Sequence, residues 1–148
     1  MKVILDANIF ISYLLSRDQQ RTIANVVETC FGQEIDLKVP QELFADLRDG
    51  VEESKYLKKH ISPAELETLI TVLTTSGEVL PPSESASISR DKDDDYLIVQ
   101  GVLHNVDYIV TGDEDLLTLG HVEGVTMITP AQFLQRIKNK NVQTKKKN

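Results

Sequence analysis

Aspartates follow two of the short apolar runs in this sequence. Asp6 comes directly after the run Lys2–Leu5, and Asp113 comes shortly after Tyr108–Val110, with Asp115 two residues further on. Runs of this kind are typical of buried strands in a parallel sheet. Ligands bind at the carboxyl edge of such sheets, so we expect Asp6 and Asp113 to share a site there.

A third candidate acid, Asp94, lies in an acidic segment that begins a predicted helix. Asp94 precedes Leu97 and Ile98 by three and four residues, so helical spacing places it at the head of the apolar stripe. Its carboxylate is therefore expected to point toward the sheet. Asp91 is suited to cap this helix, and acids in a first helical turn are also stabilised by the helix macrodipole.

Another predicted helix carries an acidic flank. Glu42, Asp46 and Asp49 lie along one side of it, beside the apolar positions Leu43 and Leu47. The spacing leaves two interpretations open, a solvated helix face or a ligand for the site at the sheet edge.

The residue types in this set favour a hard divalent cation over zinc. Cys30 is the only cysteine, and the three histidines have no metal-ligand spacing. Carboxylates that converge without a cation repel one another, whereas Mg²⁺ and Mn²⁺ prefer oxygen ligands. Such a site can activate a water molecule and stabilise charge on a phosphodiester.

The predicted elements indicate an α/β fold. Strand candidates alternate with amphipathic helix candidates, which is typical of a mostly parallel, twisted sheet covered on both faces. The strand candidates are 2–5, 35–39, 78–80, 108–110 and 125–128; the helix candidates are 8–16, 20–31, a helix that opens at Pro40, 63–76, a helix from about 91 to 102, and a final helix from 130. Phosphate-binding glycine loops and a Gly-x-Ser-x-Gly motif are absent from the sequence, which argues against nucleotide-binding and α/β-hydrolase functions.

The charge is unevenly distributed along the 148 residues. The net charge is −7, from 16 basic and 23 acidic residues, and six of the bases but none of the acids lie in 136–148. Residues 1–135 therefore carry −13, so their overall field does not favour nucleic acid. Residues 139–148 are expected to form a basic, disordered tail in which Lys145, Lys146 and Lys147 could contact phosphates.

The length and composition fit one globular domain, predicted to span 1–138. No apolar run is long enough for a membrane span, and acid at position 6 is unfavourable in a secretory signal. A cytoplasmic location is the expectation, with no membrane partner.

Three sequence blocks resemble the signature blocks of the PIN domain family. They are Val3-Ile4-Leu5-Asp6-Ala7-Asn8, the segment from Asp91 to Leu97, and the segment from Ile109 to Leu117. Together, and in this order, they are most similar to the toxin components of toxin–antitoxin systems, the VapC-type ribonucleases. The resemblance implies a three-layer α/β/α sandwich. It also implies a Mg²⁺- or Mn²⁺-dependent endoribonuclease that cuts single-stranded or loop RNA and leaves a 5′-phosphate.

The resemblance also assigns residues. It implies four catalytic acids and three auxiliary polar residues: Asp6, Asp46, Asp94 and Asp113, with Asn8, Thr111 and Asp115. Asp6, Asp94 and Asp113 are the expected metal ligands. Asp46 stands where the family has glutamate, so its side chain is shorter than the usual ligand. An antitoxin protein and a second copy of the chain are the partners that the resemblance implies.

Two other functions remain open from the sequence. Asp6 after a first strand could accept a phosphoryl group in a phosphotransfer or phosphatase domain, although position 8 is Asn and an Asp-x-Asp motif is lacking. Alternatively, the chain could be a non-catalytic PIN-like module that binds RNA or protein.

Overall fold

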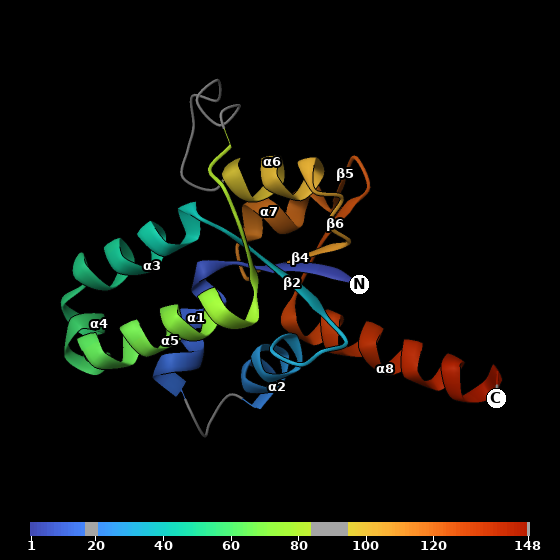
Figure 1. The fold of residues 1–148 in the computed structure, drawn as a ribbon, viewed down its shortest axis with the longest axis horizontal. Helices are drawn as coiled ribbons and strands as arrows, with labels where there is room; N and C mark the ends of the chain where they lie inside the picture. Colours follow the sequence, from blue (N-terminus) through green and yellow to red (C-terminus); the bar gives the residue numbers. More distant parts are fainter. Residues whose placement is uncertain (17–20, 84–94, 148) are drawn as a thin grey trace.

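The computed structural model describes residues 1–16, 21–83 and 95–147. Within these ranges the chain forms one sheet in which β5 is antiparallel to its neighbour and the other pairs are parallel (Figure 1). The strand order across the sheet is β3 (Glu78–Leu80), β2 (Asp36–Pro40), β1 (Lys2–Leu5), β4 (Tyr108–Val110), β6 (Val125–Ile128) and β5 (His121–Val122). β2 and then β3 are added on one side of β1. The chain then crosses over, and β4 pairs with the other side of β1. The switch in strand order therefore lies between β1 and β4.

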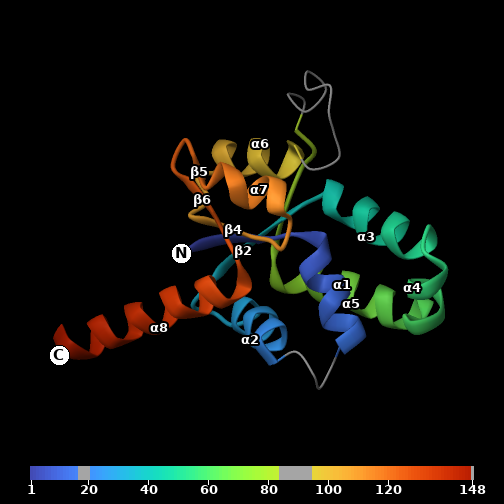
Figure 2. The same ribbon diagram turned by 180° about the vertical axis from the view of Figure 1, so that it is seen from behind.

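Helices cover both faces of the sheet. The helices are α1 (Ala7–Ser16), α2 (Arg21–Cys30), α3 (Glu42–Glu52), α4 (Lys55–His60), α5 (Pro63–Ser76), α6 (Asp95–Leu103), α7 (Glu114–Leu119) and α8 (Pro130–Lys147). In Figures 1 and 2, α6 and α7 lie on one side of the strands, and α1, α2, α5 and α8 lie on the other. The α/β/α sandwich with a mostly parallel sheet that the sequence predicts is confirmed.

The side chains of β1 show how the sheet separates two apolar cores. Val3 and Leu5 belong to the larger core, under α1, α2, α5 and α8, whereas Ile4 belongs to the smaller core, under α6 and α7. Consecutive strand residues point to opposite faces, and all three are 0 or 1% exposed. β1 is therefore one of the two central strands, fixed on both faces, and Asp6 directly follows it.

A local signal in the sequence predicts the start of α5, whereas α4, α7 and β5 are not among the predicted elements. The capping box that opens α5 is present, with the Ser62 hydroxyl accepting from the Glu65 amide and the Glu65 carboxylate accepting from the Ser62 amide, each at 3.1 Å. The predicted start of a helix at Pro40 is wrong, because Pro40 ends β2 in register with Leu80 and α3 begins at Glu42.

The C-terminal segment differs from the sequence expectation of a disordered tail. α8 continues to Lys147 and projects away from the rest of the molecule (Figures 1 and 2). Residues 139–147 contain no glycine or proline, and lysine and glutamine are good helix formers, so nothing local stops the helix. The domain boundary at 138 stays a prediction. Among the described helices, none has the length and apolar character that crossing a bilayer requires.

Candidate active site

The main chain places two of the predicted site residues at the switch in strand order. The amide of Asp6 donates to the carbonyl of Val110 at 3.0 Å, and the amide of Thr111 donates to the carbonyl of Ile128 at 3.0 Å. Sheet hydrogen bonding thus continues one residue past β1 and β4. Asp6 and Thr111 are therefore held side by side at the carboxyl edge of the sheet.

Thr111 links the two predicted metal ligands that the structure describes. Its hydroxyl donates to Asp6 Oδ2 at 2.6 Å and accepts from the Asp113 amide at 2.9 Å, and Thr111 is 0% exposed. Asp113 caps α7 because its Oδ1 accepts from the Asp115 amide at 2.9 Å. Asp6, Thr111 and Asp113 therefore come together as the sequence predicts, whereas Asp115 is exposed and contributes its main chain to this hydrogen bond.

Asp6 is a buried carboxylate, only 5% exposed. Burial raises its pKa above the ordinary value of 3.8; the Thr111 hydroxyl and the amides of Ala7 and Asn8 partly oppose this, and the negative charge of Asp113 adds to the rise. Asn8 acts here through its main chain, while the residue itself is exposed. The site thus holds an acid whose charged form is disfavoured without a cation.

The acidic flank of α3 divides between protein and solvent. The Tyr96 hydroxyl of α6 donates to Asp46 Oδ2 at 2.6 Å, and Gln100 Nε2 donates to Glu42 Oε1 at 3.2 Å. Asp49 is exposed. A solvated face therefore holds for Asp49, whereas Glu42 and Asp46 are bound by side chains of α6, and a ligand role for Asp46 stays a prediction.

Two groups of predicted residues cannot be placed in the site. Asp94, together with the predicted cap Asp91, lies outside the described residues. Within the described ranges, no three histidine, cysteine or acidic side chains come close enough together to hold a metal ion. Lys145, Lys146 and Lys147 belong to the end of α8, and in both views this end lies far from α3 and α6 (Figures 1 and 2).

A family comparison decides what kind of domain this is. The PIN domain model matches residues 2–115, which include β1, α3, α6, β4 and the start of α7. This chain belongs to the PIN domain family.

Solved structures share the fold of this PIN domain. VapBC2 from Rickettsia felis, bound to a DNA fragment from its promoter, has a TM-score of 0.60 and 14% identity, covering 86% of this chain and 97% of that one. The PIN domain endonuclease Utp24 has a TM-score of 0.54 and 15% identity, covering 85% of this chain and 82% of that one. No protein of curated function matches this sequence.

The described donor atoms of this PIN domain suit a hard divalent cation. Asp6 and Asp113 offer carboxylate oxygens, and Mg²⁺ and Mn²⁺ prefer such ligands, while no third acidic side chain among the described residues joins them. The burial of the Asp6 carboxylate fits a cation best, because a positive charge beside Asp6 and Asp113 would relieve both the burial of charge and the repulsion between the two acids.

Tyr96 and Gln100 are contacts of the acidic helix that sequence reasoning did not assign. Tyr96 is 5% exposed, and its hydroxyl binds Asp46. A signal was present in the matching four-residue spacing of Glu42 and Asp46 on α3 and of Tyr96 and Gln100 on α6. Without the pairing of the two helices, that spacing cannot be recognised.

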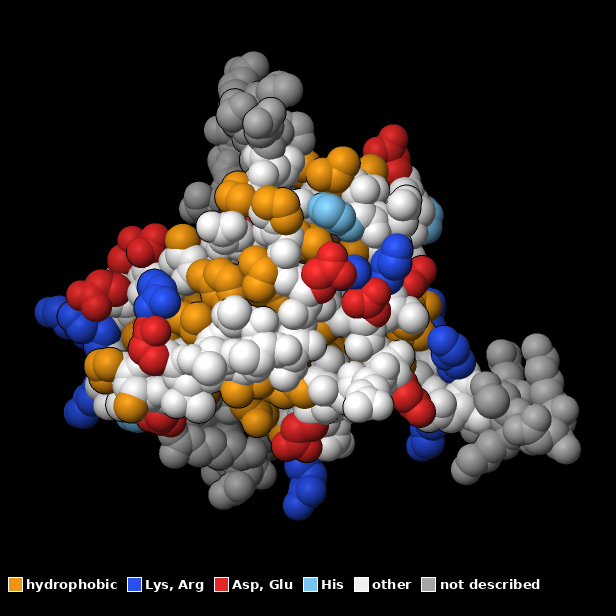
Figure 3. Space-filling view, viewed as in Figure 1, with side chains coloured by type: hydrophobic (Ala, Val, Ile, Leu, Met, Phe, Trp, Pro, Cys, Tyr) orange, Lys and Arg blue, Asp and Glu red, His pale blue; other side chains and the backbone are white. Residues whose placement is uncertain are grey.

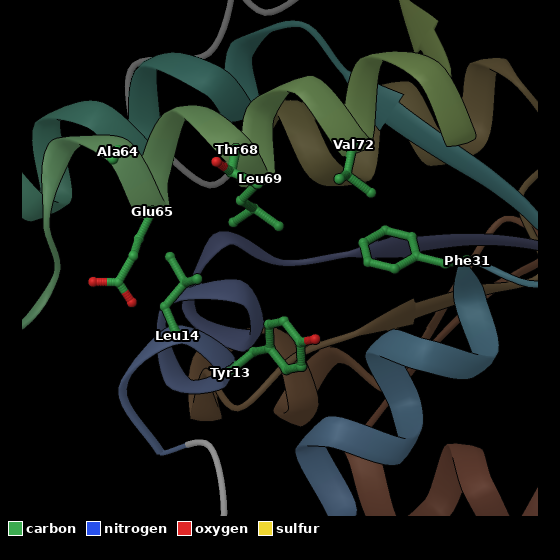
Figure 4. A pocket seen from close by; sticks show the side chains of 8 residues that line it. All are labelled: Tyr13, Leu14, Phe31, Ala64, Glu65, Thr68, Leu69 and Val72. Carbon is green, nitrogen blue, oxygen red and sulfur yellow. The ribbon is translucent and has the colours of Figure 1, made fainter.

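A separate apolar groove lies between α1, α2 and α5 of the PIN domain. Its volume is about 380 Å³, and its lining is Tyr13, Leu14, Phe31, Ala64, Glu65, Thr68, Leu69 and Val72 (Figure 4). Apolar side chains also reach the surface near the middle of the face that Figure 3 shows. This lining contains none of the predicted catalytic acids, and its apolar character suits a protein side chain better than a phosphate.

Proposed function

We propose that this PIN domain is a metal-dependent endoribonuclease and the toxin component of a toxin–antitoxin pair. The observation that carries the proposal is the buried Asp6 carboxylate at the switch in strand order, bound to Thr111 and close enough to Asp113 for their charges to interact. PIN family membership and the fold likeness to an endonuclease support a nuclease-type function.

In this proposal Asp6, Asp94 and Asp113 would hold Mg²⁺ or Mn²⁺, and Asp46 would assist them. When bound, the ion would supply an activated water and stabilise charge on the phosphodiester. Thr111 keeps the Asp6 carboxylate oriented through its hydroxyl, and the Asp115 amide does the same for Asp113. Each of the two acids is therefore held in one orientation before substrate binds.

The toxin role rests on resemblance and fold. The sequence blocks resemble VapC-type toxins, and VapBC2 from Rickettsia felis shares the fold over most of both chains. An antitoxin is therefore the proposed protein partner, and the apolar groove between α1, α2 and α5 is a suitable surface for it. A homodimer and a cytoplasmic location belong to the same proposal.

The alternative functions receive less support. Asp6 is only 5% exposed and already bound by Thr111, which disfavours it as an acceptor of a phosphoryl group. A non-catalytic binding module would need Asp6 only for its bonds to Thr111 and to the first amides of α1, which an uncharged side chain could also make.

Cleavage of single-stranded RNA by the purified chain tests the proposal. We expect activity with Mg²⁺ or Mn²⁺, none in excess chelator, and a loss of at least about 100-fold in Asp6→Asn and Asp94→Asn. Asp49→Asn, on the solvated face of α3, is the matched control and should retain activity. Full activity in chelator would exclude the metal mechanism. A loss in Asp95→Asn instead of Asp94→Asn would move the third ligand by one residue.

A further inference from the structure

Helix α4 carries a basic and aromatic surface at one end of the molecule. Its six residues, Lys55–His60, include three lysines and no acid, whereas residues 1–135 together carry a net charge of −13. In Figures 1 and 2, α4 lies at the opposite end of the molecule from the C-terminus of α8, and basic side chains project from this end in Figure 3. α4 is therefore a local positive feature on an acidic body, separate from the basic end of α8.

The packing of α4 decides which of its side chains face solvent. Leu57 packs against the larger core and so defines the inner face of the helix. At about 100° per residue, Lys55 and Lys59 lie nearly opposite Leu57, and Tyr56 and His60 lie on the flank beside the two lysines. All four of these side chains are exposed. The outer face of α4 thus joins a pair of lysines to a pair of aromatic rings.

The stability of the helix does not account for Lys55 and Lys59. Lys58 pairs with Glu52 at 3.2 Å, but neither Lys55 nor Lys59 forms an ion pair within the part of the chain that the structure describes. Like charges four residues apart repel each other across a helical turn. Lys55 also begins α4, where the helix dipole disfavours a cation. The two lysines lower the stability of the helix and are available to bind an anion.

Tyr56 adds an exposed aromatic ring beside these lysines. It is 62% exposed, and its ring packs on that of His60 with centroids 4.3 Å apart and 33° between the planes. The His60 ring is held in turn, because its Nδ1 is hydrogen-bonded to the Tyr56 carbonyl at 2.9 Å. An exposed ring that is supported from one side is a surface on which a nucleic-acid base can stack.

We propose that α4 is a binding surface for single-stranded RNA, with Lys55 and Lys59 on phosphates and the Tyr56 ring stacked on a base. The choice of RNA rests on the proposed ribonuclease function, and the surface lies outside the candidate active site. Lysines alone would accept any polyanion. The ring adds a preference for an unpaired base, which a duplex or an acidic peptide does not present.

Binding of a labelled, unstructured RNA of about 12 nucleotides to the full chain in chelator, followed by fluorescence anisotropy, tests the surface without cleavage. Tyr56→Ala should weaken binding by about 5- to 100-fold and leave its salt dependence unchanged, whereas Tyr56→Phe keeps the ring and should bind as the wild type does. Leu103→Ala is the matched control, because Leu103 is also 62% exposed but lies on α6, and it should retain wild-type affinity.

The lysines are tested by the salt dependence of the same binding. The double variant Lys55→Gln/Lys59→Gln should bind more weakly at low salt and lower the slope of log affinity against log salt by about 1.4. Its melting temperature should not fall, since the change removes a repulsion. Arg21→Gln, which removes an exposed charge on α2, should leave the slope unchanged.

Wild-type RNA affinity and salt slope in both Tyr56→Ala and the double lysine variant would overturn the proposal. Equally tight binding of duplex RNA or poly-glutamate, with the same losses in these variants, would also overturn it, because the surface would then select charge alone. Cleavage of RNA by the wild type with Mg²⁺ separates the two proposals. Cleavage without any effect of the α4 variants on binding leaves the nuclease function and removes this surface, whereas binding through α4 without cleavage leaves the surface and removes the nuclease function.

Discussion

Replacing Thr111 with valine tests how much the candidate site depends on one buried hydroxyl. Valine has nearly the same shape but loses the bond to Asp6 at 2.6 Å and leaves the Asp113 amide without its acceptor. The bond to a charged acceptor is worth about 1.5–3 kcal/mol, and the amide bond, which water can partly replace, about 0.5–1.5 kcal/mol. We expect Thr111→Val to lower the free energy of unfolding by about 2–4 kcal/mol.

Urea and thermal unfolding in chelator, near neutral pH, measure this change. For a chain of this size the expected loss lowers the melting temperature by about 5–15 °C. Thr111→Ser keeps the hydroxyl and should recover most of the loss. Thr126→Val is the matched control, because the Thr126 hydroxyl is bound to the exposed His121, and it should stay within about 0.5 kcal/mol of wild type.

The pH dependence of the loss identifies its cause. Burial raises the pKa of Asp6 above 3.8, and Thr111 opposes the rise, so Thr111→Val raises the pKa further. An acid whose pKa rises on folding favours the folded state below its unfolded pKa and loses that contribution as pH rises through its folded pKa. The loss in free energy of unfolding of Thr111→Val relative to wild type should therefore be larger at about pH 7 than at about pH 4. An equal deficit at both pH values, or a variant as stable as wild type, would refute the reasoning.

Three further outcomes are expected. Asp94→Asn should leave the metal-free fold as stable or more stable in thermal melts with chelator, since it removes a charge that repels other acids; a clearly lower melting temperature would mark Asp94 as a helix cap. Deleting 141–148 should weaken RNA binding and reduce the salt slope by about 2, while single-turnover cleavage of saturating RNA is unchanged; an unchanged slope in binding isotherms would contradict this. Ser62→Ala should cost about 1 kcal/mol in urea unfolding, because it breaks the capping box of α5, and a change near zero would show that the cap adds nothing.

The strands and the placement of Asp6 and Asp113 could be predicted because one rule governs both. A strand buried on two faces is mostly apolar, so a polar residue directly after an apolar run marks the carboxyl end of the strand. Asp6 after β1 follows this rule, and so does Thr111 after β4. The position of Asp94 stays a prediction that depends on helical spacing alone.

The turn between β5 and β6 and the contact between Tyr96 and Asp46 could not be predicted from the sequence. β5 and β6 are joined by Glu123 and Gly124, whose φ angles are 45° and 91°. A two-residue hairpin turn of this kind needs positive φ at both positions, and its usual sequence is Asn-Gly or Asp-Gly. Here Gly124 fits the second position, but Glu123 disfavours positive φ at the first, so the pair does not predict a hairpin. The Tyr96–Asp46 contact depends on how α3 and α6 pair across the edge of the sheet, and no local pattern contains that information.

The helical end of α8 gives the molecule a permanent separation of charge. Among the side chains that the structure describes, Ile137 is the last apolar one of α8 that packs against the larger core, and the helix backbone continues ten residues further, about 15 Å along its axis. At physiological salt the Debye length is about 8 Å, so a charge at the far end of this helix is largely screened from the acidic body. We expect the field of an approaching polyanion to orient the molecule so that the basic end of α8 faces it. The same asymmetry draws the basic end of one copy toward the acidic body of another, so self-association should strengthen as salt is lowered.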